Sequence, residues 1–141
     1  ACLAQLVNVI APIFTEPGGS AVKQTIYYPF ELASRYGRGT ALNLSVDCPG
    51  FENRHGTADY ISASAVQTAE GGLTVFLTNY DTEAYDLELE LHRLDYPKAV
   101  ESIVIAEGKP EPQANNLPIA NNGSVRLELA PNSYSMIRLA R

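Results

Sequence analysis

The stretch Leu87-Glu88-Leu89-Glu90-Leu91-His92 alternates apolar and polar side chains without interruption. Successive side chains of a β-strand point to opposite faces of its sheet, so the three leucines share one face and the three polar residues share the other. A strand with one apolar and one polar face is typical of an antiparallel sheet, whereas strands of a parallel sheet are apolar on both faces. Residues 87–92 therefore predict a strand of an antiparallel sheet.

Further strand-like stretches lie on both sides of this one. Residues 42–47 alternate in the same way, and residues 73–79, Leu-Thr-Val-Phe-Leu-Thr-Asn, are rich in strand-forming residues. Clusters of Pro, Gly and Asn separate the other expected strands, which are residues 60–66, 102–106, 124–129 and 134–139. About seven or eight short strands with such turn signals predict a mainly β fold, an antiparallel, jelly-roll-like β-sandwich over residues 39–141.

The beginning of the chain has a different pattern. Apolar side chains recur there at helical spacing, at Leu3, Leu6, Val7 and Ile10. This spacing predicts a helix over residues 1–9. The apolar run at residues 11–14 then predicts a short buried strand, which ends at the turn signal of residues 16–19.

Residues 25–37 predict a second helix. The Thr25 hydroxyl can accept an orphan N–H near the helix start, and Pro29 lies in the first turn, where its missing N–H costs little. Gly37 ends the helix, and Arg38 lies near the negative end of the helix dipole. The expected apolar face consists of Phe30, Leu32, Ala33 and Tyr36. Because two helices and one strand cannot close a core, residues 1–38 predict the edge of a barrel or α/β unit.

The composition argues against several classes of partner. The net charge of −6 repels phosphate backbones and anionic membrane surfaces, so we expect neither nucleic acid nor a membrane as a partner. Cys2 and Cys48 form neither a metal-ligand cluster nor a CxxC pair, and they predict free thiols in a reducing compartment. The chain does not begin with Met, which predicts a fragment or a processed product, with any export signal upstream.

A row of polar residues and a single histidine are candidates for a metal or catalytic site. Asp86, Glu88, Glu90 and His92 share one face of the expected strand, and this row fits either a metal site or, more commonly, a solvated sheet face. His55 lies in a polar loop without a visible nucleophile beside it, and it predicts a surface residue. We therefore assign no metal ligand and no cofactor.

Aromatic residues raise the question of sugar stacking. Tyr27 and Tyr28 could stack on a sugar, but at the start of a helix such residues more often pack against the core. The chain has no Trp, and its other tyrosines are spread over several expected strands. A lectin-like row of aromatic rings is therefore not favoured.

Residues 2–13 are Cys-Leu-Ala-Gln-Leu-Val-Asn-Val-Ile-Ala-Pro-Ile, residues 24–30 are Gln-Thr-Ile-Tyr-Tyr-Pro-Phe, and residues 34–39 are Ser-Arg-Tyr-Gly-Arg-Gly. These ordered stretches closely resemble the end of the catalytic barrel in α-L-arabinofuranosidases of glycoside hydrolase family 51. Further along, Asp47-Cys48-Pro49 and residues 73–79 fit the C-terminal sandwich domain of that family, with lower specificity.

The resemblance implies a specific chemistry. Family members remove terminal arabinofuranosyl groups from arabinose-containing oligosaccharides and polysaccharides with retention at the anomeric carbon, need no metal cofactor, and often form oligomers, commonly hexamers. Their (β/α)8 barrel precedes a β-sandwich that also uses strands from the protein's N-terminus. A retaining glycosidase needs two carboxylates about 5–5.5 Å apart, and the family's two catalytic glutamates lie on earlier barrel strands than the matched stretches. The resemblance therefore implies no catalytic residue in this chain.

One substrate-binding residue is carried over from the family. The Gln of its Gln-Thr-Ile stretch lies at the C-terminal rim of the last barrel strand and contacts the arabinose hydroxyls; here this residue is Gln24. An amide offers donors and an acceptor to neighbouring hydroxyls, and barrel enzymes place their sites at this rim. Without the resemblance, a hydrogen bond from Gln24 to loop backbone is the commoner alternative. Many relatives carry an aromatic residue where this chain has Val22, so we expect a different pocket shape.

Together these observations predict the C-terminal region of an α-L-arabinofuranosidase. Residues 1–38 would be the last helix, strand and helix of the barrel, and residues 39–141 would be the sandwich. The expected partners are an arabinose-containing saccharide, the remainder of the barrel and further copies of the chain, in the cytoplasm. The chain alone is predicted to be inactive.

The alternative is a free-standing β-sandwich that serves binding or oligomerisation. The two hypotheses differ in what they predict for the leading segment. A barrel remnant leaves its apolar faces exposed or covered by a neighbour, because its barrel partners are elsewhere. A self-contained domain instead buries the apolar side chains of that segment against its own sheets; these are Leu3, Leu6, Ile10 and Phe14.

Overall fold

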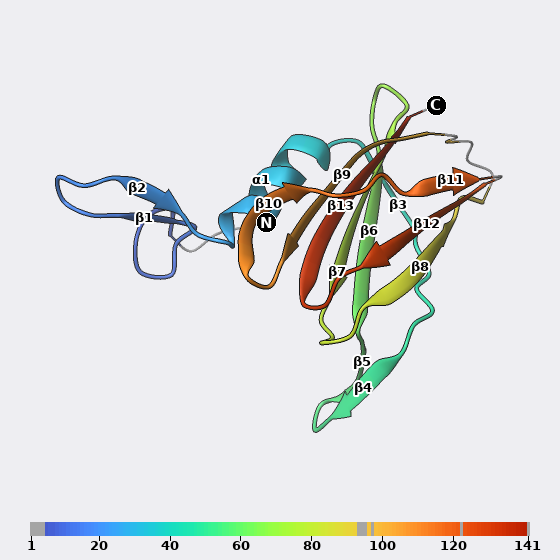
Figure 1. The fold of residues 1–141 in the computed structure, drawn as a ribbon, viewed down its shortest axis with the longest axis horizontal. Coiled ribbons are helices and arrows are strands. Elements are labelled where there is room, and N and C mark those ends of the chain that lie inside the picture. The colour runs from blue at the N-terminus through green and yellow to red at the C-terminus, as the bar shows by residue number, and fades with distance from the viewer. Residues whose placement is uncertain (1–4, 93–95, 97, 122, 141) are drawn as a thin grey trace.

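Two antiparallel β-sheets form the body of the protein in the computed structural model, which describes residues 5–92, 96, 98–121 and 123–140. The larger sheet has six strands in the order β10-β9-β13-β7-β6-β3, and the smaller has three in the order β11-β12-β8 (Figure 1). The six strands are β3 (Thr40–Leu42), β6 (Ile61–Gln67), β7 (Leu73–Asn79), β9 (Lys98–Ala106), β10 (Lys109–Ala114) and β13 (Ser133–Ala140). The three strands are β8 (Tyr85–Glu90), β11 (Ile119–Asn121) and β12 (Ser124–Leu129). We call these two sheets the sheet body.

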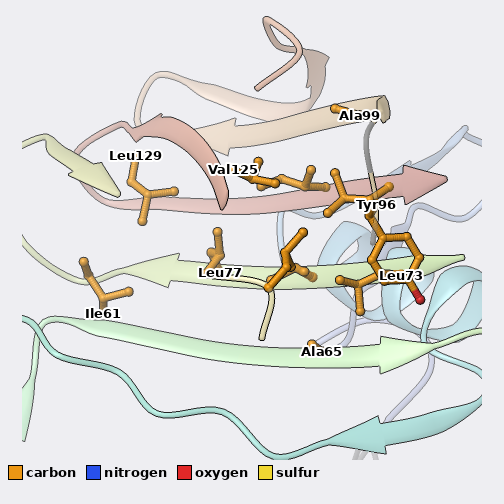
Figure 2. Packing of buried hydrophobic residues seen from close by; sticks show 12 residues of the cluster. Ile61, Ala65, Leu73, Leu77, Tyr96, Ala99, Val125 and Leu129 are labelled. Atoms are coloured by element: carbon orange, nitrogen blue, oxygen red, sulfur yellow. The ribbon is translucent and has the colours of Figure 1, made fainter. Parts of the chain in front are cut away.

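The main hydrophobic core lies between the two sheets. Val75 and Leu77 of β7 and Ile137 of β13 belong to the same buried cluster as Val125 and Leu129 of β12. Figure 2 shows these apolar side chains gathered between the strands. Because the cluster joins residues from both sheets, its burial holds the sheets face to face.

The expected antiparallel, mainly β fold is confirmed. Each strand expected between residues 39 and 141 overlaps a strand of the sheet body. In β8, Leu87 and Leu89 are half-buried against the core, whereas Glu88 and Glu90 face solvent. Residues 42–48 show the same alternation in burial, although only residues 40–42 pair with β6.

The opposite face of the six-stranded sheet is covered by α1 (Tyr27–Tyr36). Tyr28 and Leu32 of the helix pack in a second cluster with Phe76 of β7, Ile105 of β9 and Met136 of β13. The neighbours Val75 and Phe76 thus face opposite layers, as the period of two in a strand requires.

The predicted apolar face of this helix needs correction. Phe30 and Ala33 are exposed, and the buried side chains are Tyr28 and Leu32, four residues apart on one side of the helix. Leu32 and Tyr36 of the predicted face do pack on the sheet, whereas Tyr28 occupies the buried side in place of Phe30 and Ala33.

The predicted ends of the helix are partly correct. The Thr25 side chain does not cap α1, because the N-cap position is Ile26 and no side chain bonds there. At the other end, Gly37 is the C-cap, and its N–H donates to the Ala33 carbonyl. Arg38 donates from Nε to the Ser34 carbonyl, 3.1 Å away, as expected of a basic residue at this end.

The helix predicted over residues 1–9 is wrong for the part that the structure describes. Residues 5–10 form bends, a turn and a bridge from Val7 to Ile13. Asn8 has φ 62° and Val9 has φ 54°, values outside a right-handed helix. The Asn8 side chain binds Thr15 instead, in the way that Asn competes with helix formation. Leu3 lies outside the described residues.

Two hairpins protrude from the sheet body, on different sides of it (Figure 1). The first consists of β1 (Ile13–Thr15) and β2 (Ala21–Lys23). The strand predicted at residues 11–14 is therefore present at its second half, but it is half-buried to exposed instead of buried, because it pairs in a protruding hairpin. The second consists of β4 (Gly50–Asn53) and β5 (Gly56–Asp59), and its residues are all exposed. No helix within the described residues is long and apolar enough to cross a membrane.

The junction between α1 and β3 gives a test of this packing. Gly39 has φ 147°, and a β-carbon there would overlap the carbonyl oxygen of Gln67. Gly39→Ala should therefore lower the free energy of unfolding by about 2 kcal/mol or more, through overlap as well as backbone strain. Chemical denaturation measures the loss. Gly56→Ala is the matched control, because Gly56 has φ 126° but nothing within 4 Å of its added carbon. Equal losses in the two variants would contradict the overlap.

Candidate functional site

Gln24 lies between β2 and α1, and the backbone fixes it there. Its N–H donates to the Pro12 carbonyl at 2.8 Å, and its own carbonyl accepts the N–H of Tyr27 at 2.9 Å. The side-chain Nε2 donates to the Ala11 carbonyl at 2.5 Å. The commoner alternative considered for Gln24, a bond to loop backbone, is therefore present in the structure. The amide oxygen has no hydrogen-bond partner within the described residues, so it remains an available acceptor.

The loop that holds Gln24 is itself fastened at its base. Asn8 Oδ1 accepts the backbone N–H of Thr15 at 2.7 Å and its hydroxyl at 3.1 Å, while Asn8 N–H donates to the Ile13 carbonyl at 2.8 Å. These bonds join the chain before β1 to the β1–β2 hairpin. Ala11 and Pro12, which lie between Asn8 and β1, are buried and provide the two carbonyls that bind Gln24.

Charged and aromatic side chains surround the start of α1. Lys23 Nζ lies 4.3 Å from the ring centroid of Tyr27 and 3.9 Å from Glu31 Oε2. The rings of Tyr27 and Tyr28 meet edge to face, with centroids 5.6 Å apart. Burial raises the pKa of Tyr28, and the charge of Glu111 adds to that rise. Both rings take part in the packing of α1 on the sheet, as the packing interpretation expects.

The leading segment exposes apolar side chains. Leu6 is 68% exposed, Ile10 70% and Phe14 45%. Together with residues of α1, Leu6 lines an open cavity of about 550 Å³ whose apolar wall includes Pro12 and Phe30. Exposed large apolar side chains around a cavity are a feature of surfaces that pack against further protein.

The polar row on β8 is a solvated sheet face. Glu88 pairs with Arg126 of β12 at 3.2 Å, and Glu90 pairs with His92 at 3.1 Å. Hydrogen bonds from Ser124 and Arg126 lower the pKa of Glu88. Within the described residues, no group of three or more His, Cys, Asp or Glu side chains could hold a metal ion.

The remaining candidates are also separate from Gln24. His55 lies at the exposed tip of the β4–β5 hairpin, as expected, and its ring nitrogen accepts the Arg54 Nε–H. Cys48 is a half-buried free thiol that packs against the main core, and Cys2 lies outside the described residues. The structure thus brings none of these residues together with Gln24.

The sequence matches a family model described as the alpha-L-arabinofuranosidase C-terminal domain, over residues 1–133. The chain is 40% identical to an intracellular exo-α-(1→5)-L-arabinofuranosidase of Streptomyces lividans, over 99% of the chain and 23% of that protein. It is 37% identical to an enzyme of the same description from Halalkalibacterium halodurans, over 100% of the chain and 31% of that protein. The chain therefore spans about a quarter to a third of the length of these relatives.

The fold agrees with this match. A solved family 51 α-L-arabinofuranosidase from Bifidobacterium longum superimposes with a TM-score of 0.86 at 25% identity. The superposition covers 97% of this chain and 30% of that structure. It therefore includes the leading segment as well as the sheet body.

The hydrogen bonds from Thr15 to the Asn8 side chain give a test of how the β1–β2 hairpin is held. Asn8→Ala removes the acceptor for Thr15, so the Thr15 amide should exchange with deuterium about tenfold faster, while the melting temperature of the sheet body should not change. Hydrogen exchange measured residue by residue reports the first effect and thermal denaturation the second. Asn43→Ala is the control, because Asn43 is exposed and directly follows β3, outside the β1–β2 hairpin. Unchanged exchange at Thr15 would show that the side chain of Asn8 does not hold the hairpin.

Proposed function

Because the chain belongs to the α-L-arabinofuranosidase C-terminal domain family, we propose that it is the C-terminal region of a retaining α-L-arabinofuranosidase. In this proposal residues 1–38 complete a catalytic (β/α)8 barrel, and residues 39–141 form a sandwich packed against it. The two catalytic carboxylates belong to the preceding part of the enzyme, and this chain supplies Gln24 to the substrate site.

The exposed apolar face of the leading segment carries the proposal. A free-standing module would bury Leu6, Ile10 and Phe14 against its own sheets, and all three are exposed. Meanwhile the inner face of α1 is buried on the sheet body through Tyr28 and Leu32. A segment anchored on one side and apolar on the other has the form expected of the end of a barrel whose other strands and helices lie elsewhere.

The open edge of the smaller sheet supports the same proposal. Within the described residues, β8 forms a ladder on its β12 side alone. Residues 43–49 run beside the core without joining a sheet, and an open cavity of about 490 Å³ separates Leu44 and Val46 from Leu87 and Leu89. An unpaired strand edge beside an apolar slot is a template for further strands, which in this family come from the protein's N-terminus.

The geometry of Gln24 supports its contact with substrate. Its amide nitrogen is bonded to the Ala11 carbonyl, which fixes the orientation of the side chain. The amide oxygen can then accept a hydrogen bond from a hydroxyl of the terminal arabinose. In a (β/α)8 barrel the segment between a strand and the next helix lies on the catalytic face, and in this proposal Gln24 belongs to such a segment, directly after the β1–β2 hairpin and before α1.

The proposal extends to partners and location. Arabinose-containing oligosaccharides or polysaccharides would be the substrates, and further copies of the enzyme would form a homo-oligomer. The names of the relatives from Streptomyces lividans and Halalkalibacterium halodurans describe intracellular enzymes, which supports a cytoplasmic location for this one.

Hydrolysis of p-nitrophenyl α-L-arabinofuranoside tests whether the catalytic carboxylates lie in the preceding part of the enzyme and this chain completes the barrel. The chain alone should release no p-nitrophenol, because it lacks the carboxylate pair. A chimera in which this chain replaces the matching region of the Streptomyces lividans relative should hydrolyse the substrate, whereas the truncated relative without either region should not. Hydrolysis by the purified chain alone, or a folded chimera without activity, would refute the proposal.

Within the active chimera, Gln24→Ala should lower kcat/KM about tenfold, because one hydrogen bond to the substrate is lost. Gln113→Ala, an exposed glutamine on β10, is the matched control and should leave kcat/KM unchanged. Circular dichroism confirms that both variants fold. Equal kinetics for the two variants would remove Gln24 from the substrate site.

A further inference from the structure

A further cavity, of about 530 Å³, opens at the start of α1. Three segments that are distant in sequence meet there: the end of β7, the β9–β10 turn and the β12–β13 turn. The side chains that line the cavity include Thr25, Thr78, Tyr80, Glu107, Asn132 and Tyr134. The cavity is shallow and open to solvent, its volume falls within the range of small-molecule sites, and most of its lining is apolar with a few polar groups.

The floor of this cavity is rigidly built. Asn79 is 2% exposed, and its Nδ2 donates to the carbonyls of Glu83 and Ala130 at 2.8 and 2.9 Å. Its Oδ1 accepts the N–H of Asp81 at 2.9 Å. The buried amide thereby joins the β7–β8 turn to the β12–β13 turn, so the two walls keep their spacing.

Polar groups on the rim converge across the opening. Asn132 Nδ2 donates to Glu107 Oε2 at 3.3 Å, which bridges two of the three segments. Asn132 has φ 44°, and its backbone N–H donates to the Asp81 carbonyl at 2.8 Å, so the strained turn is held in place. An amide beside a carboxylate offers adjacent acceptors and donors, which suits the neighbouring hydroxyls of a sugar.

Two tyrosines provide the apolar surface. Tyr80 is 58% exposed at the rim, so its ring is available to a ligand. Tyr134 lies deeper and stacks on Phe76 with ring centroids 6.3 Å apart. Burial raises the pKa of Tyr134 to about 12, so its hydroxyl remains a hydrogen-bond donor at neutral pH. Aromatic faces with hydroxyl groups at their edges fit the mixed apolar and polar surface of a saccharide.

The position of the cavity relates it to the proposed active site. Thr25 lines the cavity and directly follows Gln24, and Pro29 of the first turn of α1 lines it too. If α1 is the last barrel helix, its first turn lies on the catalytic face. An exo-acting enzyme holds the terminal sugar at its active site, and the rest of the saccharide must leave along that face.

We propose that this cavity is a saccharide subsite that binds arabinofuranosyl units more distant from the cleaved bond, with Tyr80 as the stacking surface and Asn132 and Glu107 as hydroxyl partners. The subsite rests on the proposed function and extends it, because it would make the sheet body a determinant of preference for longer substrates.

Binding to the chain alone is the first test, with a linear α-(1→5)-linked arabinopentaose followed by two-dimensional ¹⁵N NMR. The amide signals of Tyr80 and residues 132–134 should shift and saturate. Tyr80→Ala should weaken binding about fivefold or more, and so should Asn132→Gly, which removes the amide but keeps the positive φ. Phe51→Ala is the matched control, because Phe51 is an exposed aromatic residue that does not line the cavity. Absence of saturable shifts at the cavity, or binding that Tyr80→Ala does not weaken, would overturn the subsite.

The chimera separates failure of the subsite from failure of the proposed function. Tyr80→Ala should lower kcat/KM for the pentaose about fivefold and leave hydrolysis of the p-nitrophenyl substrate unchanged. If the variant cleaves both substrates as well as the parent chimera does, the subsite is refuted and the proposed function stands. If the parent chimera cleaves neither, the proposed function is refuted, and the binding experiment on the chain alone still decides whether the cavity holds a saccharide.

Discussion

Burial of β7 and β13 on both faces is the constraint on which the rest of the structure depends. Val75 and Ile137 face the smaller sheet, while their neighbours Phe76 and Met136 face α1. Either face left in water would expose large apolar side chains in the centre of the sheet, so both the smaller sheet and the helix are needed. The requirement for α1 on the outer face is also what fixes Gln24, which lies three residues before the helix begins.

Most of the sheet body was predictable because side-chain alternation in a strand reports directly which face is buried. The α1 helix was predictable from Pro29 and Gly37, but its buried face only in part, since Tyr28 and Phe30 are both aromatic and only the sheet selects between them. The β4–β5 hairpin escaped prediction because its residues are exposed on both faces. In β10, Pro110 and Pro112 resemble a turn, yet an edge strand tolerates them where the register shifts.

The site was predictable to a smaller extent. Residue patterns alone favoured a backbone hydrogen bond for Gln24, and that bond is present. The expectation of a substrate contact came from the resemblance to a family. The cavity beside α1 had no signal in sequence, because its walls come from three turns separated by about 25 residues each, and only the strand order brings them together.

The short connection between Gln24 and α1 determines how far Gln24 can move relative to the sheets. Domains joined by flexible linkers change their relative positions freely. Here the chain enters a helix within three residues, and that helix is packed on the central strands through Tyr28 and Leu32. Because only two residues separate Gln24 from this packed helix, a disturbance of the sheet packing would reach the orientation of the amide.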